Sequence, residues 1–248
     1  MQITELMCFG ARPGLGNPAL VIGEGPASAS ARQDYARESR RTCVFVTPLP
    51  GGQLEADYYY PHTRSPLCLH ASLAVGGLHG PLLLRTAMQG QQLRLSCTDG
   101  AVFVAVQQQA AATPAQLPDW PGLAPVSAPR VASVGSPKLL VEVADAATLH
   151  ALQPPLAQLL AWGRAHGVNG CYVYCKVGER EYAGRNFNHL DPALEDSATG
   201  VAAGALSALL GHGLTLYQGR ATGKDCRIVT RILGQDILVG GAVEVSIL

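Results

Sequence analysis

The feature of this 248-residue sequence that most restricts its fold is an internal repeat. Each half gives the same order of predicted elements: two strands, a helical region, two strands, a turn, a helix of small residues and further strands. The strands VFV at 44–46 and YVY at 172–174 lie about 128 residues apart, and Cys68 and Asp196 have the same separation. The repeat predicts two similar lobes of mixed α+β structure.

Apolar runs and turn residues place these elements along the chain. In the first half we expect strands at 2–8, 18–23, 43–49, 55–60, 92–97 and 101–106, with helices at 28–40 and from Cys68. In the second half we expect strands at 130–134, 138–143, 170–176, 180–187, 214–217, 226–232 and 236–247, with helices at 146–166 and from Asp196. Residues 107–125 contain four prolines and no periodicity, which is typical of a connector. We therefore predict an N-terminal lobe at 1–112, a Pro-rich connector at 113–126 and a C-terminal lobe at 127–248.

The helices expected after Cys68 and Asp196 consist mainly of Ala, Gly, Ser, Leu and Val, and neither has a charged face. A helix that is apolar all round is buried on every side. Gly76, Gly77 and Gly204 cost helix propensity, so their presence indicates that strands approach these helices closely. The pattern predicts that each lobe is a β-barrel-like sheet wrapped around a central apolar helix, with the active site in the cleft between the lobes.

The charge balance excludes several classes of protein. Lysine and arginine together number 18, as do aspartate and glutamate, which argues against a nucleic-acid-binding surface. No run of about 18 apolar residues is present, so we expect no membrane span. The start of the chain, MQITELMCFGARPG, has neither a basic region nor a long apolar stretch, and seven cysteines is an odd number. We therefore expect a cytoplasmic protein with reduced thiols.

Sequence signals for a metal or a cofactor are missing. Cys171 and Cys175 are four residues apart on an apolar strand without a nearby histidine, so we expect no zinc site. No GxGxxG motif follows a predicted strand, and there is no phosphate-binding loop. We expect a protein that needs neither metal nor cofactor.

Cys68 and Asp196 occupy matching places just before the two apolar helices. If the lobes pack face to face, both helix N-termini point into one cleft, where their free N–H groups bind a carboxylate. A helix N-terminus also stabilises a thiolate, which prepares Cys68 as a base. A thiol and a carboxyl on opposite sides can take a proton from one face of a carbon and return one to the other face, or move it along a conjugated system.

Six segments carry a resemblance to a known family: GLGNPALVI (14–22), RTCVFV (41–46), PHTRSPLCLHAS (61–72), GRNFNHLDPALEDSATGVAAGAL (184–206), YQGR (217–220) and ILVGGAVEV (237–245). They resemble the phenazine-biosynthesis (PhzF-like) family of the diaminopimelate epimerase-like superfamily, and the resemblance covers essentially the whole chain in order. It implies two α+β halves, each a β-barrel around a central helix, with the active site between them. It also implies an isomerase, epimerase or racemase that acts without metal, flavin or pyridoxal phosphate.

The sequence departs from that family at several positions. The phenazine enzymes carry a catalytic Glu where this chain has Thr42, typically a Glu at Arg64, and a GHP motif where it has Leu69-His70-Ala71. Their Asp is retained as Asp196. Proline racemase and diaminopimelate epimerase carry a Cys at the position of Cys68, and their second Cys corresponds to Asp196 or Ser197. The chain therefore resembles a hybrid of the two groups.

We predict that Cys68 and Asp196 are catalytic. The predicted substrate-binding residues are Asn17, Arg64, His70, Ser197, Thr199 and Gly200. Five of them have a structural alternative: Cys68 as a small buried residue, Asp196 as a helix cap, His70 as a core histidine, Arg64 as a solvated side chain and Asn17 as a turn former. The N–H groups at Thr199 and Gly200 are candidates for a carboxylate or oxyanion cradle.

The function predicted from these residues is that of a cofactor-independent isomerase. It abstracts and returns a proton α to the carboxylate of a small amino or hydroxy acid, with an allylic proton shift as the close alternative. A different class stays open: a PhzF-like protein that binds a small carboxylate without converting it. Thr42, in place of the catalytic Glu of the phenazine enzymes, favours this alternative. We expect a small-molecule carboxylate as partner and no nucleic acid or membrane partner, and we leave a homodimer open.

Overall fold

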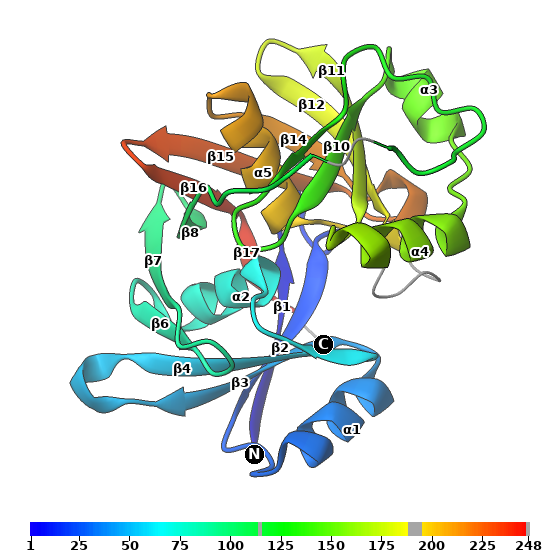
Figure 1. Ribbon diagram of the computed structural model, residues 1–248. Helices are drawn as coiled ribbons and strands as arrows, with labels where there is room; N and C mark the ends of the chain where they lie inside the picture. Colours follow the sequence, from blue (N-terminus) through cyan, green and yellow to red (C-terminus); the bar gives the residue numbers. More distant parts are fainter. Residues whose placement is uncertain (114–115, 188–194, 247–248) are drawn as a thin grey trace. The chain divides into compact units, whose positions relative to one another are not determined.

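The computed structural model describes residues 1–113, 116–187 and 195–246 (Figure 1). The chain forms two compact units. Unit 1 contains Met1–Ala105 and the C-terminal segment from Gly240, and unit 2 contains Val106–Val239. Parts of the predicted connector (114–115), of the motif at 184–206 (188–194) and of the last predicted strand (247) lie outside the described residues.

Unit 1 is a continuous sheet around a helix. Its strands are β1 (Gln2–Cys8), β2 (Asn17–Gly23), β3 (Thr42–Pro48), β4 (Leu54–Tyr60), β5 (Thr63–Ser65), β6 (Leu83–Thr86), β7 (Gln92–Thr98), β8 (Ala101–Gln107) and β17 (Val243–Val245). Its helices are α1 (Ala29–Ser39), α2 (Leu69–His79) and the short 3-10 helix η1 (Pro50–Gly52). Pairing runs from β17 through β1, β2, β3, β4, β6 and β7 to β8, and β5 pairs with β4.

Unit 2 has the same kind of construction. Its strands are β9 (Arg130–Ala132), β10 (Lys138–Glu142), β11 (Cys171–Gly178), β12 (Glu181–Phe187), β13 (Glu195–Asp196), β14 (Thr215–Gln218), β15 (Cys226–Leu233) and most of β16 (Asp236–Gly241). Its helices are α3 (Ala146–Ala151), α4 (Leu156–His166), α5 (Gly200–Leu210) and the 3-10 helix η2 (Arg220–Thr222). Pairing runs from β9 through β10, β11, β12 and β14 to β15, and β13 pairs with β12.

Within each unit, the strand pairs follow the same order of parallel and antiparallel pairing. In unit 1 an antiparallel pair (β1 and β2) is followed by a parallel, an antiparallel, a parallel and an antiparallel pair, ending at β7. In unit 2 the series from β9 to β15 has the same senses in the same order. Each unit is therefore an α+β structure of the type that the sequence predicts.

The central helices of the two units, α2 and α5, are enclosed by strands (Figure 1). Residues Leu69 to Gly76 of α2 are all buried. A Cβ at Gly76 would lie 2.6 Å from a methyl of Val102, and one at Gly204 in α5 would lie 2.8 Å from a methyl of Val134. Such distances are shorter than van der Waals contact allows. The helix glycines are therefore required by close packing against strands, as the sequence predicts.

Each sheet has a second helical layer on its other face. In unit 1, α1 covers a core of Leu20, Ile22, Ala36, Cys43, Phe45 and Tyr59. In unit 2, α3 and α4 cover a larger core built on alternate residues of β10 and β11, including Leu139, Val141, Cys171, Val173 and Cys175. Alternation along the strands leaves the intervening residues facing α2 or α5. These intervening residues can therefore reach the N-terminal end of each central helix, which we call its head.

Three of the differences from the sequence-based prediction bear on the site or on the division into units. The helix expected from Asp196 begins at Gly200, because Glu195 and Asp196 pair with β12 as strand β13. The last predicted strand is divided into β16 and β17, and β17 pairs with β1, so the C-terminus belongs with unit 1 rather than with a lobe at 127–248. Trp120, within the predicted connector, is not a linker residue: it lies in the core of unit 2, and its Nε1 donates to the Gln153 carbonyl oxygen.

Candidate active site

The head of α2 presents the thiol of Cys68. Cys68 is the N-cap, and its Sγ accepts a hydrogen bond from the backbone N–H of Ala71 at 3.5 Å. The Tyr60 hydroxyl also donates to Sγ at 3.2 Å. Hydrogen-bond donors and the positive end of a helix favour a thiolate over a thiol. This arrangement suits a sulfur that has to accept a proton.

A chain of buried hydroxyls fixes the first turn of α2. The Ser72 hydroxyl donates to the carbonyl oxygen of Cys68 at 2.8 Å, so the Tyr58 hydroxyl, 2.7 Å away, is the donor to Ser72. Burial raises the pKa of Tyr58 far above its usual range, which keeps this hydroxyl protonated. Tyr58 and Tyr60 are two residues apart on β4 and therefore point to the same side of the sheet, toward α2. The strand pattern YYY thus supplies two groups to the helix head.

His70 and Asn17 lie together beside this helix head. His70 is only 6% exposed, and its Nε2 lies 2.9 Å from the backbone carbonyl oxygen of Asn17. A carbonyl oxygen can only accept a hydrogen bond, so Nε2 carries a proton. Cys68, His70 and Asn17, three predicted site residues, are therefore brought together in unit 1.

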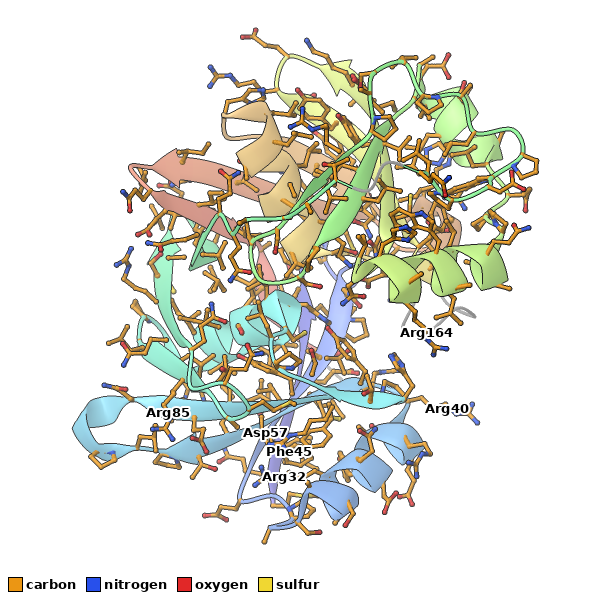
Figure 2. The ribbon with its side chains drawn as sticks, viewed as in Figure 1. Arg32, Arg40, Phe45, Asp57, Arg85 and Arg164 are labelled. Carbon is orange, nitrogen blue, oxygen red and sulfur yellow. The ribbon has the colours of Figure 1, made fainter. Side chains whose placement is uncertain are left out.

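Arg64 lies on the other face of the sheet. On β5 it pairs with Tyr59 of β4, whose ring packs in the core under α1. The Arg64 Nε donates to the buried carboxylate of Asp57 at 2.7 Å, and Arg32 donates to the second oxygen of the same carboxylate. Figure 2 shows Arg32 and Asp57 beside Phe45 where α1 packs on the sheet. This placement favours a structural role for Arg64, as an anchor of α1, over the predicted contact with substrate.

The head of α5 presents the carboxylate of Asp196. Thr199, the N-cap of α5, donates its hydroxyl to Asp196 Oδ2 at 2.6 Å, and the Ala198 N–H lies 3.5 Å from Oδ1. Thr199 is the N-cap of α5, just as Cys68 is the N-cap of α2. Thr199, and not Asp196 or Ser197, is therefore the counterpart of Cys68. The physical reason is that Asp196 still belongs to a strand and stands three positions before the N-cap. Its side chain reaches forward to the helix head through Thr199.

Gln218 of β14 fixes the Asp196 backbone and Thr199; it lies in the YQGR segment, but the sequence analysis gave it no role. Its Nε2 donates to the Asp196 carbonyl oxygen at 2.7 Å and to the Thr199 hydroxyl at 3.1 Å. Its Oε1 accepts from the Tyr172 hydroxyl at 3.1 Å and from the Thr199 N–H at 3.3 Å. Every amide atom of Gln218 is therefore used. The resulting network orients Thr199 toward Asp196.

Ser197 points to a different partner. Thr222 of η2 donates its single hydroxyl proton to the Gly219 carbonyl oxygen at 2.8 Å. The Ser197 hydroxyl, 2.8 Å from Thr222, must therefore be the donor between them. Gly200 is the first residue of α5, so its N–H belongs to the helix head. The structure brings Asp196, Thr199 and Gly200 together and holds the Ser197 hydroxyl against η2.

Two buried polar residues near Asp196 were also missed by the sequence analysis. Lys138 on β10 is 2% exposed, and its ammonium donates to the Asn169 carbonyl oxygen. Asn186 on β12 is fully buried directly opposite Asp196, and neither atom of its amide has a hydrogen-bond partner among the residues that the structure describes. A lysine or amide inside a predicted apolar strand is a sequence signal that could have identified them, and Asn186 also lies in the quoted segment 184–206. Both residues stand in apparently ordinary strand sequences, KLLVE and EYAGRNF.

Two further observations concern metal and membrane. Among the described residues, no three side chains of His, Cys, Asp or Glu are grouped so that they could hold a metal ion. Cys171 and Cys175 lie in the outer core of unit 2, and burial raises the pKa of the Cys171 thiol to about 12. No helix within the described ranges is long and apolar enough to cross a membrane.

This fold, with one strand-enclosed helix per unit, is of the diaminopimelate epimerase-like type. It is shared with a predicted epimerase from Pseudomonas aeruginosa, at a TM-score of 0.80 and 24% identity over 99% of this chain and 96% of that one. A hydroxyproline epimerase from Agrobacterium vitis, solved with bound trans-4-hydroxy-L-proline, has a TM-score of 0.67 and 14% identity over 99% of this chain and 89% of its own. These likenesses establish the fold.

The family follows from the sequence comparisons. The model of the family described as phenazine biosynthesis-like protein (PhzC-PhzF) matches residues 115–245. An uncharacterized isomerase from Deinococcus radiodurans is 30% identical over 99% of this chain and 92% of that protein. An uncharacterized isomerase, YddE, from Salmonella typhimurium is 28% identical over 90% of this chain and 87% of that protein. The chain belongs to the phenazine biosynthesis-like family, and the predicted resemblance is confirmed.

Proposed function

We propose that this protein is a cofactor-independent isomerase that moves a proton at a carbon next to the carboxylate of a small amino or hydroxy acid. One observation carries the proposal. The head of each central helix holds a group that can accept a proton, Cys68 in unit 1 and Asp196 in unit 2, and each group is hydrogen-bonded in place. The isomerase names of the curated relatives support the same class of reaction.

The chemistry follows from the two groups. One of them, as the base, takes the proton from the α carbon, and the electron pair of the C–H bond passes into the substrate carboxylate as an enolate-like group. The other, as the acid, gives a proton to the opposite face of the same carbon. The product differs from the substrate only in configuration, and the two groups exchange roles in the reverse direction. Backbone N–H groups at the helix heads favour the extra negative charge on the substrate carboxylate.

The hydrogen bonds act differently on Cys68 and on Asp196. Tyr60 and the Ala71 N–H stabilise the anionic sulfur of Cys68. Thr199 holds the carboxylate of Asp196 so that Oδ2 is oriented by a charge-assisted bond. His70, with Nε2 bound to Asn17, is the proposed contact for a polar group of the substrate. A ligand bound next to Asp196 can also form hydrogen bonds with the buried amide of Asn186.

A non-catalytic protein that binds a small carboxylate is the second candidate, and one observation favours it. Thr42, at the start of β3, stands where the phenazine enzymes carry their catalytic Glu. In that case the helix heads bind a carboxylate without exchanging the substrate proton. The two functions differ in whether the C–H bond at the α carbon is broken.

The test is the entry of solvent deuterium into small chiral acids. A panel of amino and hydroxy acids is incubated with the protein in deuterium oxide, and the α position and the optical rotation are followed by NMR and polarimetry. The proposal predicts that at least one acid gains deuterium at its α carbon and loses optical rotation. Retention of activity with a metal chelator is expected as well. Binding of an acid without any exchange would support the second candidate, and activity lost to a chelator and restored by metal would contradict cofactor independence.

A further inference from the structure

The side chain of Asn186 is a buried amide that takes no part in holding the fold together. The residue is 0% exposed, and within the described part of the chain neither Oδ1 nor Nδ2 has a hydrogen-bond partner. An amide can donate two hydrogen bonds and accept two. Burying such a group unpaired costs free energy, so nearly all buried polar side chains in folded proteins are paired. An exception of this kind points to a group that the amide binds.

Strand alternation directs this amide toward α5. Arg185, just before it on β12, donates to two carbonyl oxygens at the end of α3. Phe187, just after it, lies in the core under α3 and α4. Successive residues of a strand point to opposite faces of the sheet. Arg185 and Phe187 therefore face the outer helices, and Asn186 faces the inner side, where α5 lies.

Asp196 lies directly beside Asn186 on this inner face. The two residues are opposite each other on the antiparallel strands β12 and β13, and the Cβ atoms of such pairs are about 4.5–5.5 Å apart. On the outer face Arg185 donates to both carboxylate oxygens of Glu195, at 3.0 and 2.8 Å, and so fixes β13 against β12. The carboxylate at the head of α5 and the Asn186 amide are therefore neighbours on adjacent strands.

The other cross-strand neighbour of Asn186 leans away from it. Tyr172 of β11 lies opposite Asn186, but its hydroxyl donates to Gln218 Oε1 at 3.1 Å. To reach Gln218 the ring passes over Gly184, where a Cβ would collide with the tyrosine hydroxyl. The phenol is thus used elsewhere, and the amide stands next to the Asp196 carboxylate.

A small acid bound at the head of α5 matches the needs of this amide. The carboxylate of the acid can only accept hydrogen bonds, so it can bind Nδ2 but not Oδ1. Oδ1 needs a donor, and an ammonium or a hydroxyl on the α carbon provides one directly beside the carboxylate. An amide holds its acceptor and its donor side by side on one carbon. An α-amino or α-hydroxy acid presents a donor and an acceptor with the same close spacing.

We propose that Asn186 is a specificity-determining residue that selects the substrate by its α substituent. Nδ2 donates to the carboxylate, and Oδ1 accepts from an α-ammonium or α-hydroxyl group. Because the amide is buried, an acid with only hydrogen on its α carbon leaves Oδ1 unpaired at full cost, and such an acid is rejected. The inference rests on the proposed function for its site, whereas binding and stability can be measured without turnover.

The first experiment needs no added acid. Asn186→Leu replaces the amide with an apolar group of similar shape, and Gln218→Met makes the corresponding change at an amide whose atoms are all used. We expect the urea midpoint of unfolding to rise in Asn186→Leu, because an unpaired buried amide is removed. It should fall in Gln218→Met, because the partners of Gln218 lose their hydrogen bonds.

Asn186→Ala, which is smaller, covers the case that leucine does not fit. A lower midpoint in Asn186→Ala as well as in Asn186→Leu would overturn the proposal, because it would show that the amide is needed by the fold itself.

The second experiment measures which acids bind. The probes are two series of matched size: L-alanine, L-lactate and propionate, and L-phenylalanine, L-phenyllactate and hydrocinnamate. Binding is followed by NMR at the backbone N–H of Gly200, the first residue of α5. In at least one series the α-substituted acids should bind at least about tenfold more tightly than the unsubstituted acid, and this ratio should fall to about one in Asn186→Leu and Asn186→Ala. An unchanged ratio, or no binding of any probe, would overturn the proposal.

Turnover separates this inference from the proposed function. With an acid that exchanges its α proton, Asn186→Leu should raise KM about tenfold or more with a smaller effect on kcat, whereas Asp196→Asn should lower kcat. Exchange in Asn186→Leu with an unchanged KM would reject the role of Asn186 and retain the isomerase. Selective binding through Asn186 without any proton exchange would reject the isomerase and retain the role of Asn186.

Discussion

The heads of α2 and α5 differ in where the reactive group stands relative to a helix of the same length. In unit 1 the thiol is the N-cap itself, and the helix N–H of Ala71 points at the sulfur of Cys68. In unit 2 the carboxylate of Asp196 is three residues before the N-cap, and the hydroxyl of Thr199 reaches back to it. A shared topology therefore fixes the position of the helix head but not the residue that supplies the chemistry.

The electrostatic surroundings of the two heads also differ. Cys68 receives hydrogen bonds from a tyrosine hydroxyl and a backbone N–H, which are neutral donors. Asp196 has the buried ammonium of Lys138 on the same face of its sheet. A thiolate can be sustained by dipoles at a helix N-terminus, whereas the partly buried carboxylate of Asp196 accepts a charge-assisted hydrogen bond from the Thr199 hydroxyl. The comparison predicts that the two heads respond differently to substitution.

The largest expected effect comes from removing either reactive group. Asp196→Asn removes the carboxylate base and retains its shape, and Cys68→Ser replaces the thiol with a hydroxyl that is a far weaker acid. Each change should reduce turnover by about 100-fold or more, the usual contribution of a positioned acid or base. Each variant should still exchange the α proton of one enantiomer with solvent without converting it. Full activity of both variants would show that the two-base mechanism is wrong.

Lys138→Met should stabilise the folded protein near pH 7. The pKa of Lys138 falls from 10.5 to about 8 on folding because of burial, which corresponds to about 3 kcal/mol, as each tenfold change in proton affinity is about 1.4 kcal/mol. Below pH 8 both states carry the proton and the full penalty acts on the folded state. Between pH 8 and 10.5 the unfolded state binds more protons, so the stability of the unmodified protein rises with pH.

Urea denaturation at several pH values measures this effect. The variant should be more stable than the unmodified protein by up to about 3 kcal/mol at pH 7. The difference should shrink as the pH approaches 10. A difference that does not depend on pH would mean that lysine burial is not its source. Lys176→Met serves as the control, with little change expected at an exposed site.

Thr199→Val tests whether the N-cap acts on Asp196. The substitution retains the shape of the side chain and removes the hydroxyl that donates to Oδ2. A hydrogen bond to a charged group contributes about 1.5–3 kcal/mol, so turnover should fall roughly tenfold or more, and Thr199→Ser should restore it. Thr222→Val, which removes the partner of Ser197, should leave turnover near the original value. The reverse order of effects would move the reactive role from Asp196 to Ser197.

The smallest expected effect concerns the packing around the central helices. A methyl at Gly76 would meet Val102, and one at Gly204 would meet Val134. Gly→Ala at either site should lower the free energy of unfolding by about 1–2 kcal/mol, because overpacking exceeds the gain in helix propensity. Gly76→Ala combined with Val102→Ala should recover part of the loss specific to the pair. A stabilising Gly76→Ala would mean that the strands leave room around α2.

Much of the fold could be predicted from local signals, and the exceptions have physical causes. Alternating apolar strands and the two glycine-containing apolar helices predicted the α+β units, because burial on all sides leaves a clear compositional pattern. The start of α5 was placed at Asp196 rather than Gly200, since the pairing of β13 with β12 is a long-range contact. The return of β17 to β1 was missed for the same reason. Strand partners far apart in sequence leave no local pattern.

The candidate site was only partly predictable. Cys68, His70 and Asp196 were predicted as site residues because motif and repeat drew attention to them, and their role stays a prediction. Lys138 and Gln218 were not found, because a lysine at the start of a strand and a glutamine at the end of one normally reach solvent. Only strand register shows that both point inward. Side-chain direction across neighbouring strands is the information that the sequence alone lacks.

The central claim is that Cys68 and Asp196 act on opposite faces of one carbon. A crystal structure of the protein with a bound small acid, or an unreactive analogue of one that exchanges its α proton, tests it most directly. Each reacting atom should lie about 3–3.5 Å from the α carbon, so the sulfur and the nearer carboxylate oxygen should be about 6–7 Å apart with the carbon between them. A ligand that has both groups on the same face, or a carbon that only one of them can reach, would contradict the account.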